Sequence, residues 1–186
     1  MSKKILITSD LHGSSYFVNN MLSLFEKEKC DMILLLGDLL YHGPRNDLPY
    51  EYEVKNKAEN LNKYKNQILA DKGNCDSEVD QMMFEFPIMQ ENMILNFDDL
   101  VFYATHGHIY NDKNLPPFSN INILLNGHFH IPTFNKNVGF YYINPGSVSI
   151  PKMNSTNSCI IYKDKKFYFY DKKNKNDYNI YRTENI

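Results

Sequence analysis

The chain has 186 residues, of which 42% are hydrophobic and 23% are charged. This length predicts one domain over residues 1–186, because it supports a sizeable core but is too short for two ordinary domains. The 20 Lys and Arg residues against 22 Asp and Glu residues give a net charge of -2, which excludes a whole-chain basic field for collecting nucleic acid or anionic membranes.

The cysteines and the N-terminus indicate the cellular compartment. Cys30, Cys75 and Cys159 are odd in number and form no Cys-x-x-Cys pair, which argues against a disulfide framework and against a thiolate zinc site. The first apolar run reaches Asp10 too early for a signal peptide, and no stretch approaches the roughly 18 apolar residues of a membrane span. We therefore expect a cytoplasmic protein with reduced thiols and no membrane partner.

Taken in chain order, the first half alternates apolar runs with helical patterns. Apolar runs at 4–10, 32–38 and 67–74 lack polar alternation, which is typical of strands buried on both faces. Between them, apolar residues recur at helical spacing over 14–29, with Ser14 or Ser15 as the N-cap. A second helix is predicted over 50–64, with Val54, Ala58, Leu61 and Tyr64 on its apolar face and its Lys and Glu residues on the other face.

The second half carries two more apolar runs, at 101–108 and 123–130, and then changes in texture. Short aromatic and β-branched runs separated by turn residues predict antiparallel strands after Asn126. The lysines that begin the tail 172–186 are expected to form a solvated edge. The elements together predict an α/β fold with helices on both sides of a sheet.

Each apolar run ends at a polar cluster. The first three runs end at Asp10 and His12, at Asp38 and at Asn74, and the later two end at His106 with His108 and at His128 with His130. Ligands of open α/β sheets bind outside the carboxyl ends of the strands, so residues distant in sequence can meet there.

Taken singly, these motifs have ordinary structural explanations. Asp10 with His12 suits a helix cap with an incidental histidine, and Asp38 and Asn74 suit turns. If Asp10 and Asp38 meet at ~4 Å, however, their repulsion of about 4 kcal/mol at an effective dielectric of 20 calls for a cation. Imidazole, carboxylate and amide oxygen together suit Mn, Fe, Co or Zn better than Ca or Cu(I).

The ordered set Asp-x-His, Gly-Asp, Gly-Asn, His and Gly-His-x-His resembles the calcineurin-like metallophosphoesterase superfamily. The blocks LHGS, GDLLYHGPRN, GNCDSEVDQM, THGH, NLPP, GHFHIP and NPGSVSIPK, over residues 8–152, are similar to the bacterial YfcE-type phosphodiesterases. The resemblance implies a four-layer α-β-β-α fold, in which two mixed β-sheets pack face to face between flanking helices and the metal site lies at the strand C-terminal ends. It also places the NPGS turn near that site.

The resemblance further implies a binuclear metal centre. One metal would be held by Asp10, His12 and His130, the other by Asn74, His106 and His128, and Asp38 would bridge both. Asp38, Asn74 and His106 would then also be catalytic. The ions are expected to be Mn²⁺, with Fe, Co, Ni or Zn as alternatives. Such a pair can activate a shared hydroxide for in-line attack on a small phosphodiester without a covalent intermediate.

The usual leaving-group acid is missing, because Cys75 stands where many members of the superfamily have a histidine. Weak protonation of the leaving group favours esters with acidic leaving groups, although His108 or Asp76 could substitute as the acid. Arg45, His42, Cys75 and His108 are candidate substrate contacts, each weighed against a loop, spacer or second-shell role.

Three alternatives stay open at this point. A phosphomonoesterase or a nuclease could use the same metals, and a scaffold like the retromer subunit of this fold could bind proteins without turnover. The seven filled ligand positions favour the enzyme, and no stable nucleic-acid partner is expected. The aromatic strand Phe167–Tyr170 alternates poorly with polar residues, which suggests that another subunit helps to cover it in a dimer or tetramer.

Overall fold

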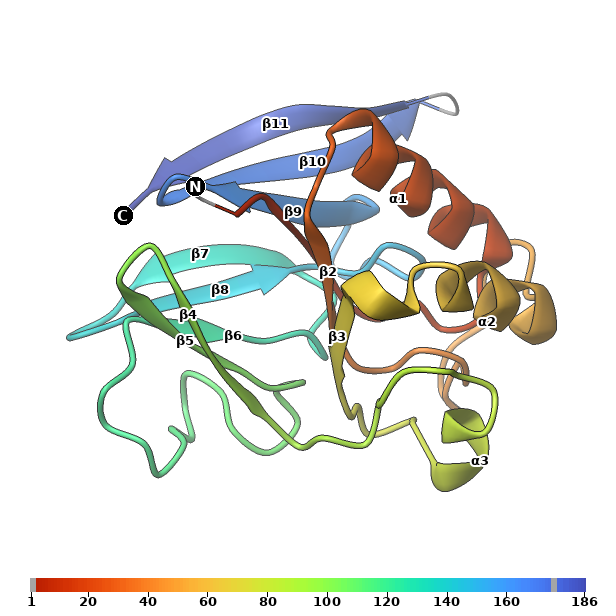
Figure 1. The fold of residues 1–186 in the computed structure, drawn as a ribbon, viewed down its shortest axis with the longest axis horizontal. Helices are drawn as coiled ribbons and strands as arrows, with labels where there is room; N and C mark the ends of the chain where they lie inside the picture. Colours follow the sequence, from red (N-terminus) through yellow and green to blue (C-terminus); the bar gives the residue numbers. More distant parts are fainter. Residues whose placement is uncertain (1–2, 175–176) are drawn as a thin grey trace.

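The computed structural model describes residues 3–174 and 177–186 and contains two mixed β-sheets (Figure 1). The first sheet has six strands in the order β11-β10-β9-β1-β2-β3. Strands β1, β2 and β3 run parallel, whereas β9, β10 and β11 continue the sheet by antiparallel pairing from β1. The bounds are β1 Ile5–Thr8, β2 Met32–Leu36, β3 Ile68–Asp71, β9 Ser158–Lys163, β10 Lys166–Asn174 and β11 Asp177–Asn185.

The second sheet has five strands in the order β4-β5-β6-β8-β7. Strands β5, β6 and β8 are parallel, and the outer strands β4 and β7 pair antiparallel with β5 and β8. The bounds are β4 Met93–Phe97, β5 Leu100–Ala104, β6 Ile123–Leu125, β7 Pro132–Lys136 and β8 Tyr141–Pro145. The predicted strands therefore form, although the parallel β6–β8 pair departs from the antiparallel pattern expected after Asn126.

The alternation of side chains along each strand divides the core in two. In β1, Ile5 and Ile7 face the second sheet, whereas Leu6 faces the helices. The same division holds in β2, where Leu34 and Leu36 lie between the sheets and Leu35 packs under the helices. Both faces of the parallel strands are thus buried, which explains their uninterrupted apolar sequence.

Helices α1 (Ser15–Lys27) and α2 (Val54–Asn62) pack on one face of the first sheet (Figure 1). Ser14 is the N-cap of α1, and its hydroxyl accepts a hydrogen bond from the Phe17 N–H. Helix α2 is shorter than the predicted 50–64, and one of its lysines breaks the expected polar face. Lys57 is fully buried, and its ammonium donates to the Leu39 carbonyl. Two short elements, η1 (Lys65–Gln67) and α3 (Glu78–Gln81), follow.

The expected α/β fold of two mixed sheets packed face to face is confirmed, with helices on the first sheet and a loop on the outer face of the second. From β4 onward, the described chain forms strands and loops and no helix. The outward side chains Tyr103, Leu124 and Tyr142 are covered by Phe118 and Ile121 from the loop after β5, and by Phe140. A loop therefore replaces a helical layer there, and the two mixed sheets with few flanking helices are the fold.

The aromatic residues of β10 are covered by the chain itself. Phe167 and Phe169 are fully buried between the sheets, and Tyr170 is buried on the helix face. Their poor alternation therefore reflects the intramolecular core and needs no second subunit. Strand β11 forms the edge of the sheet, whereas Lys172 is buried, with its ammonium 4.3 Å from the centre of the Tyr16 ring, and does not belong to a solvated edge.

Candidate metal centre

The structure brings together all seven side chains expected to bind metal. Asp10 and His12 follow β1, Asp38 follows β2, and Asn74 follows β3 of the first sheet. The histidines of the second sheet follow its parallel strands: His106 comes after β5, and His128 and His130 come after β6. The carboxyl ends of the parallel strands in both sheets therefore bring these side chains together.

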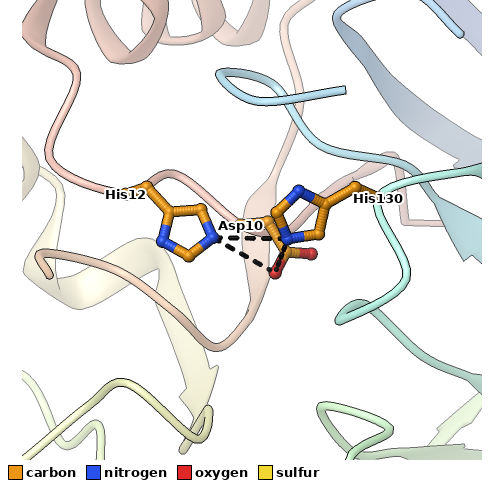
Figure 2. A group of neighbouring side chains, drawn as sticks. All are labelled: Asp10, His12 and His130. Carbon is orange, nitrogen blue, oxygen red and sulfur yellow. Dashed lines mark hydrogen bonds and ion pairs between the residues drawn. The ribbon is translucent and has the colours of Figure 1, made fainter. Parts of the chain in front are cut away.

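Asp10, His12 and His130 form one cluster (Figure 2). Asp10 Oδ1 lies 3.1 Å from His130 Nε2 and 3.7 Å from His12 Nε2, and the two Nε2 atoms are 3.3 Å apart. All three side chains are buried, and Asp10 Oδ1 accepts no hydrogen bond from the described residues. A buried carboxylate oxygen facing two imidazole nitrogens fits a cation between them.

Asp38 lies between this cluster and a second one. Its Oδ2 is 3.8 Å from His12 Nε2 and 3.4 Å from His106 Nε2. On the far side, His106 Nε2 lies 3.1 Å from Asn74 Oδ1. The His128 ring stands 5.1 Å from the His106 ring, centre to centre, and completes the second group of donors. One carboxylate thus faces both clusters.

Backbone carbonyls orient three of the histidines. The Nδ1 atoms of His12, His106 and His130 lie 2.8, 2.7 and 2.5 Å from the carbonyl oxygens of Tyr41, Leu36 and Ile150. Each Nδ1–H donates to its carbonyl, so each Nε2 points into the centre. This is the outer arrangement that metal-binding histidines commonly have.

The backbone at the site is held in an unusual conformation. Asp10, His12, Asp38, His128 and His130 all have positive φ, between 44° and 65°. Non-glycine residues rarely adopt this region, and such strain concentrates at functional sites. Gly73 allows the loops to approach, because an added Cβ there would lie 2.1 Å from Asp38 Oδ1.

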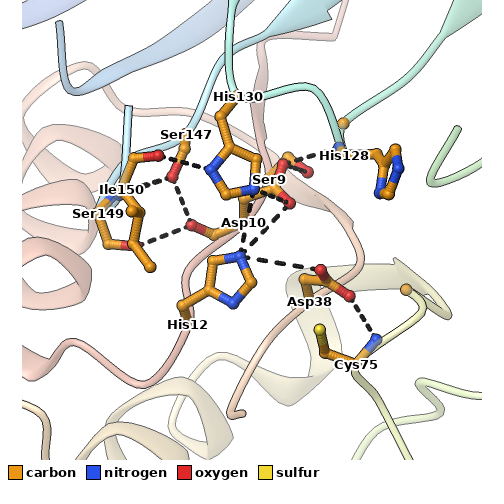
Figure 3. Close-up of polar contacts among 12 residues, drawn as sticks. Ser9, Asp10, His12, Asp38, Cys75, His128, His130, Ser147, Ser149 and Ile150 are labelled. Carbon is orange, nitrogen blue, oxygen red and sulfur yellow. Dashed lines mark hydrogen bonds and ion pairs between the residues drawn. The ribbon is translucent and has the colours of Figure 1, made fainter. Parts of the chain in front are cut away.

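Several polar side chains fix Asp10. The Ser9 hydroxyl and the His128 N–H donate to its Oδ2 at 2.7 and 2.9 Å. Ser147 and Ser149 donate to the Asp10 backbone carbonyl at 2.7 and 2.9 Å (Figure 3). Both serines lie in the segment NPGSVS, so the turn expected near the site supports the backbone of the first cluster.

Asp76 serves the same purpose on the other side of the centre. Its Oδ2 accepts hydrogen bonds from the Asp38 and Gly73 N–H groups at 2.7 and 2.8 Å, and its Oδ1 accepts one from the Leu39 N–H at 2.8 Å. The side chain is buried, and both oxygens are engaged. This carboxylate therefore ties the loops after β2 and β3 together, and its role as a leaving-group acid stays a prediction.

The electrostatics of the metal-free centre follow from burial and from the convergence of charges. Burial raises the pKa of Asp38, but His106 and the Cys75 N–H outweigh it and hold that pKa below its ordinary range. Burial lowers the pKa of His106, yet the Asp38 and Asp10 carboxylates raise it to about 10. Burial and the neighbouring His106 lower the pKa of His128 to about 4. In the metal-free centre, the positive charge on His106 thus balances the carboxylates, as a bound cation would.

Asp71 is a further buried acid behind the centre, at the end of β3. Neither carboxyl oxygen has a hydrogen-bond partner among the described residues, and burial raises its pKa well above the ordinary value. A carboxyl group without donors is more stable in the neutral form at this depth. Asp71 was not singled out in the sequence, because it lies within the predicted strand 67–74.

The open side of the centre is a small polar cavity of about 50 Å³. Of the four candidate substrate contacts, Arg45 and Cys75 line it. His42 packs instead between the rings of Tyr41 and Tyr52. His108 is exposed beside His106, with 5.4 Å between the ring centres, and does not line the cavity.

Two polar residues of the cavity wall were not expected from the sequence. Asn46 and Lys152 contribute to its walls, from the loop after β2 and from the segment after the NPGS turn. The quoted blocks GDLLYHGPRN and NPGSVSIPK end on these two residues, so a search of the block ends for polar side chains would have found them. A larger cavity of about 450 Å³, lined mainly by apolar residues of 115–124 and 138–140, contains none of the cluster residues.

The chain matches a known family profile. Residues 4–166 fit the calcineurin-like phosphoesterase superfamily domain. The chain belongs to this superfamily. The family and the enzyme class expected from the sequence are thereby confirmed, and the chain is a phosphoesterase.

Individual relatives agree with this assignment. The chain is 40% identical over 149 residues to "Phosphodiesterase YfcE" of Escherichia coli, covering 80% of this chain and 81% of the relative. The solved structure of that E. coli phosphoesterase superposes with a TM-score of 0.91 at 35% identity, over 98% of this chain and 99% of the other. Vacuolar Protein Sorting 29 of Cryptosporidium parvum has a TM-score of 0.71 at 17% identity, over 100% and 98% of the two chains, which shows a shared fold alone.

None of the helices in residues 3–174 and 177–186 is both long and apolar enough to cross a membrane.

Proposed function

We propose that this phosphoesterase is a phosphodiesterase that works with two divalent metal ions. The observation that carries the proposal is the position of Asp38, whose Oδ2 faces His12 Nε2 at 3.8 Å and His106 Nε2 at 3.4 Å. A carboxylate between two donor clusters suits a bridging ligand. Two bound ions would supply a hydroxide nucleophile at neutral pH and neutralise the phosphate oxygens during in-line attack, without a covalent intermediate.

The remaining donors divide by their contacts. Asp10, His12 and His130 would hold one ion, and Asn74, His106 and His128 would hold the other. The chemistry of this set, with imidazole and oxygen donors, supports Mn²⁺, and Fe, Co, Ni or Zn fit the same donor types. Asp38, Asn74 and His106 are thereby the catalytic residues of the proposal, since they would contact the ions that act on the phosphate.

Two cationic side chains support binding of a phosphate. Arg45 and Lys152 line the cavity beside the clusters, and both are exposed and able to turn towards an anion. We assign them to the phosphate oxygens, with Arg45 able to form paired hydrogen bonds. The cavity is small and polar, which suits the phosphate group itself.

We infer a preference for diesters with acidic leaving groups, because the described side chains beside the cavity include no good proton donor for the leaving oxygen. Cys75 lines it in place of an imidazole, and burial with the nearby Asp38 carboxylate raises the pKa of Cys75 to about 12 in the metal-free chain. Asp76 is fully engaged with backbone groups. Weak protonation of the leaving oxygen favours an aryl diester over an alkyl one.

The wider setting of the enzyme is part of the same proposal. We assign it to the cytoplasm, which is supported by three free cysteines. We treat residues 1–186 as one domain because the two sheets share a continuous core. Its partners are then a small phosphodiester and, in a dimer or tetramer, further copies of the chain, with no stable nucleic acid and no membrane.

The test compares an aryl phosphodiester with the matching monoester. Metal-stripped protein is assayed before and after addition of Mn²⁺, together with Asp38→Asn and the matched control Asp99→Asn. Asp99 is exposed in the β4–β5 turn and shares the positive φ of Asp38, so it experiences the same chemical change away from the site.

We expect Mn²⁺-dependent cleavage of the diester that falls by more than about 100-fold in Asp38→Asn, since even outer groups of metal sites contribute roughly 10- to 100-fold. Asp99→Asn should match the parent. Preference for the monoester would change the assignment to a phosphomonoesterase. Inactivity with every metal tested would favour the scaffold.

A further inference from the structure

Cys75 belongs to a third group of potential metal donors that the seven expected ligands do not include. Its Sγ, an imidazole nitrogen of His12 and a carboxylate oxygen of Asp38 all lie within 4.8 Å of one another. His12 and Asp38 are two of the expected ligands, so the thiol stands at the centre itself. The sulfur lies on the side of Asp38 and His12 in Figure 3.

Local contacts hold the thiol in this place. The Cys75 N–H donates to Asp38 Oδ1 at 2.8 Å, which fixes the backbone of the residue against the bridging carboxylate. The Asn74 side-chain amide donates to Sγ at 3.2 Å. On the opposite wall, Gly43 has φ +82°, and an added Cβ there would lie 3.4 Å from Sγ. The sulfur therefore lies in the cavity wall, held by Asn74 and close to the loop that carries Gly43.

A separate observation points to a cation at His12, which the Cys75 group shares with the first cluster. Asp10 Oδ1 is buried without a hydrogen-bond donor among the described residues, and it lies 3.7 Å from the same His12 Nε2 that faces Asp38. The Nδ1 of His12 is occupied by the Tyr41 carbonyl, so its Nε2 is the atom available to an ion.

We propose that Cys75 is an additional, soft ligand of the metal centre and selects among metals; this inference rests on the proposed two-metal function. With a thiophilic ion such as Co²⁺, Zn²⁺ or Cd²⁺, Sγ binds the metal as a thiolate and its proton passes to solvent. With Mn²⁺, which prefers oxygen and nitrogen donors, the thiol stays protonated and unbound.

A bound sulfur would raise the affinity for the metal but lower the rate of hydrolysis. Cys75 lines the cavity through which a phosphate reaches the clusters. A sulfur bound to the ion takes up coordination on that open side, where substrate would otherwise bind. Thiophilic metals therefore bind more tightly but support slower hydrolysis than Mn²⁺, and removal of the sulfur should reduce both differences.

Titration of the metal-free protein with Co²⁺ tests the inference without an activity assay. We would record the absorption spectrum of the parent, of Cys75→Ser and of Cys30→Ala. Cys30 is buried in the core under the helices and serves as the matched control for loss of one thiol. A sulfur-to-cobalt charge-transfer band should appear in the parent and in Cys30→Ala and be absent from Cys75→Ser.

Affinity gives a second readout on the same proteins. Cys75→Ser should weaken Cd²⁺ binding by on the order of tenfold or more, the scale of losing one group from a metal site, and leave Mn²⁺ binding unchanged. Binding of Co²⁺ without the charge-transfer band, or persistence of the band in Cys75→Ser, would overturn the role of Cys75 while the metal centre stands. Failure of the parent to bind Co²⁺ or Mn²⁺ would instead overturn the proposed function together with this inference.

Discussion

Asp76 joins the two loops that carry Asp38 and Asn74, and removal of its carboxylate measures how much the centre depends on that junction. Three backbone N–H groups, from Asp38, Leu39 and Gly73, donate to this one buried side chain. In Asp76→Ala all three donors lose their acceptor. Each buried donor left unsatisfied costs about 1–3 kcal/mol.

The lower end of that range applies if water enters the space left by the carboxylate, so we expect a loss of about 3–4 kcal/mol in the free energy of unfolding. This is a large fraction of the roughly 5–15 kcal/mol available to a domain. Asp76→Asn should cost less. Its remaining oxygen can occupy the position of Oδ2 and keep two of the three donors, which predicts a loss of about 1–2 kcal/mol.

Urea denaturation of the metal-free proteins gives the stability, and calorimetric titration with Mn²⁺ gives the affinity. We expect Asp76→Asn to bind metal more weakly than the parent, and Asp76→Ala to bind it more weakly still, because the backbone of Asp38 is no longer fixed. Asp80→Ala is the control, since Asp80 also accepts hydrogen bonds from Ser77 but does so in the capping box of α3, away from the clusters. A loss below about 1 kcal/mol in Asp76→Ala, with metal affinity equal to that of the parent, would refute the positioning role.

Two further predictions concern protons. Asp71 keeps a proton in the folded chain at pH values where the unfolded chain has lost it, so the parent should lose more stability than Asp71→Asn as the pH rises above about 4. Denaturation of both metal-free proteins at pH 4 and pH 7 measures the difference, and parallel pH profiles would contradict the assignment. His106, with its pKa raised to about 10, is protonated at pH 7 and must be neutral to bind a metal. Mn²⁺ binding should therefore release about one proton per chain at pH 7 and strengthen with rising pH, which calorimetry in buffers of different ionisation enthalpy would detect, and binding without proton release would count against it.

Much of the centre could be predicted from the sequence because its residues follow strand ends. Asp10, Asp38 and His106 each stand just beyond an apolar run, and parallel strands deliver their carboxyl ends to one edge whatever the details of packing. Helix α1 was likewise recognisable, since Ser14 and the apolar residues that follow it carry both the cap and the buried face.

Other features could not be predicted from the sequence, because they depend on contacts between distant segments. The sequence pattern places Lys57 on a polar helix face, yet α2 packs where its ammonium reaches the Leu39 carbonyl. The three backbone donors that converge on Asp76 include two from the distant loop after β2. The loop that covers the second sheet contains no helical pattern, so only its packing against Tyr142 and Leu124 shows that it replaces a layer.

The sequence by itself determined the family, the donor chemistry and the order of the ligands, because these depend on residue types and on where apolar runs stop. Only the tertiary structure decided that Asp38 lies between two clusters, that carbonyls turn three imidazoles inward, and that Arg45 lines the cavity while His42 does not. The physical reason is that direction and separation depend on loop backbone at positive φ and on packing between two sheets, neither of which is encoded in the spacing of residues along the chain.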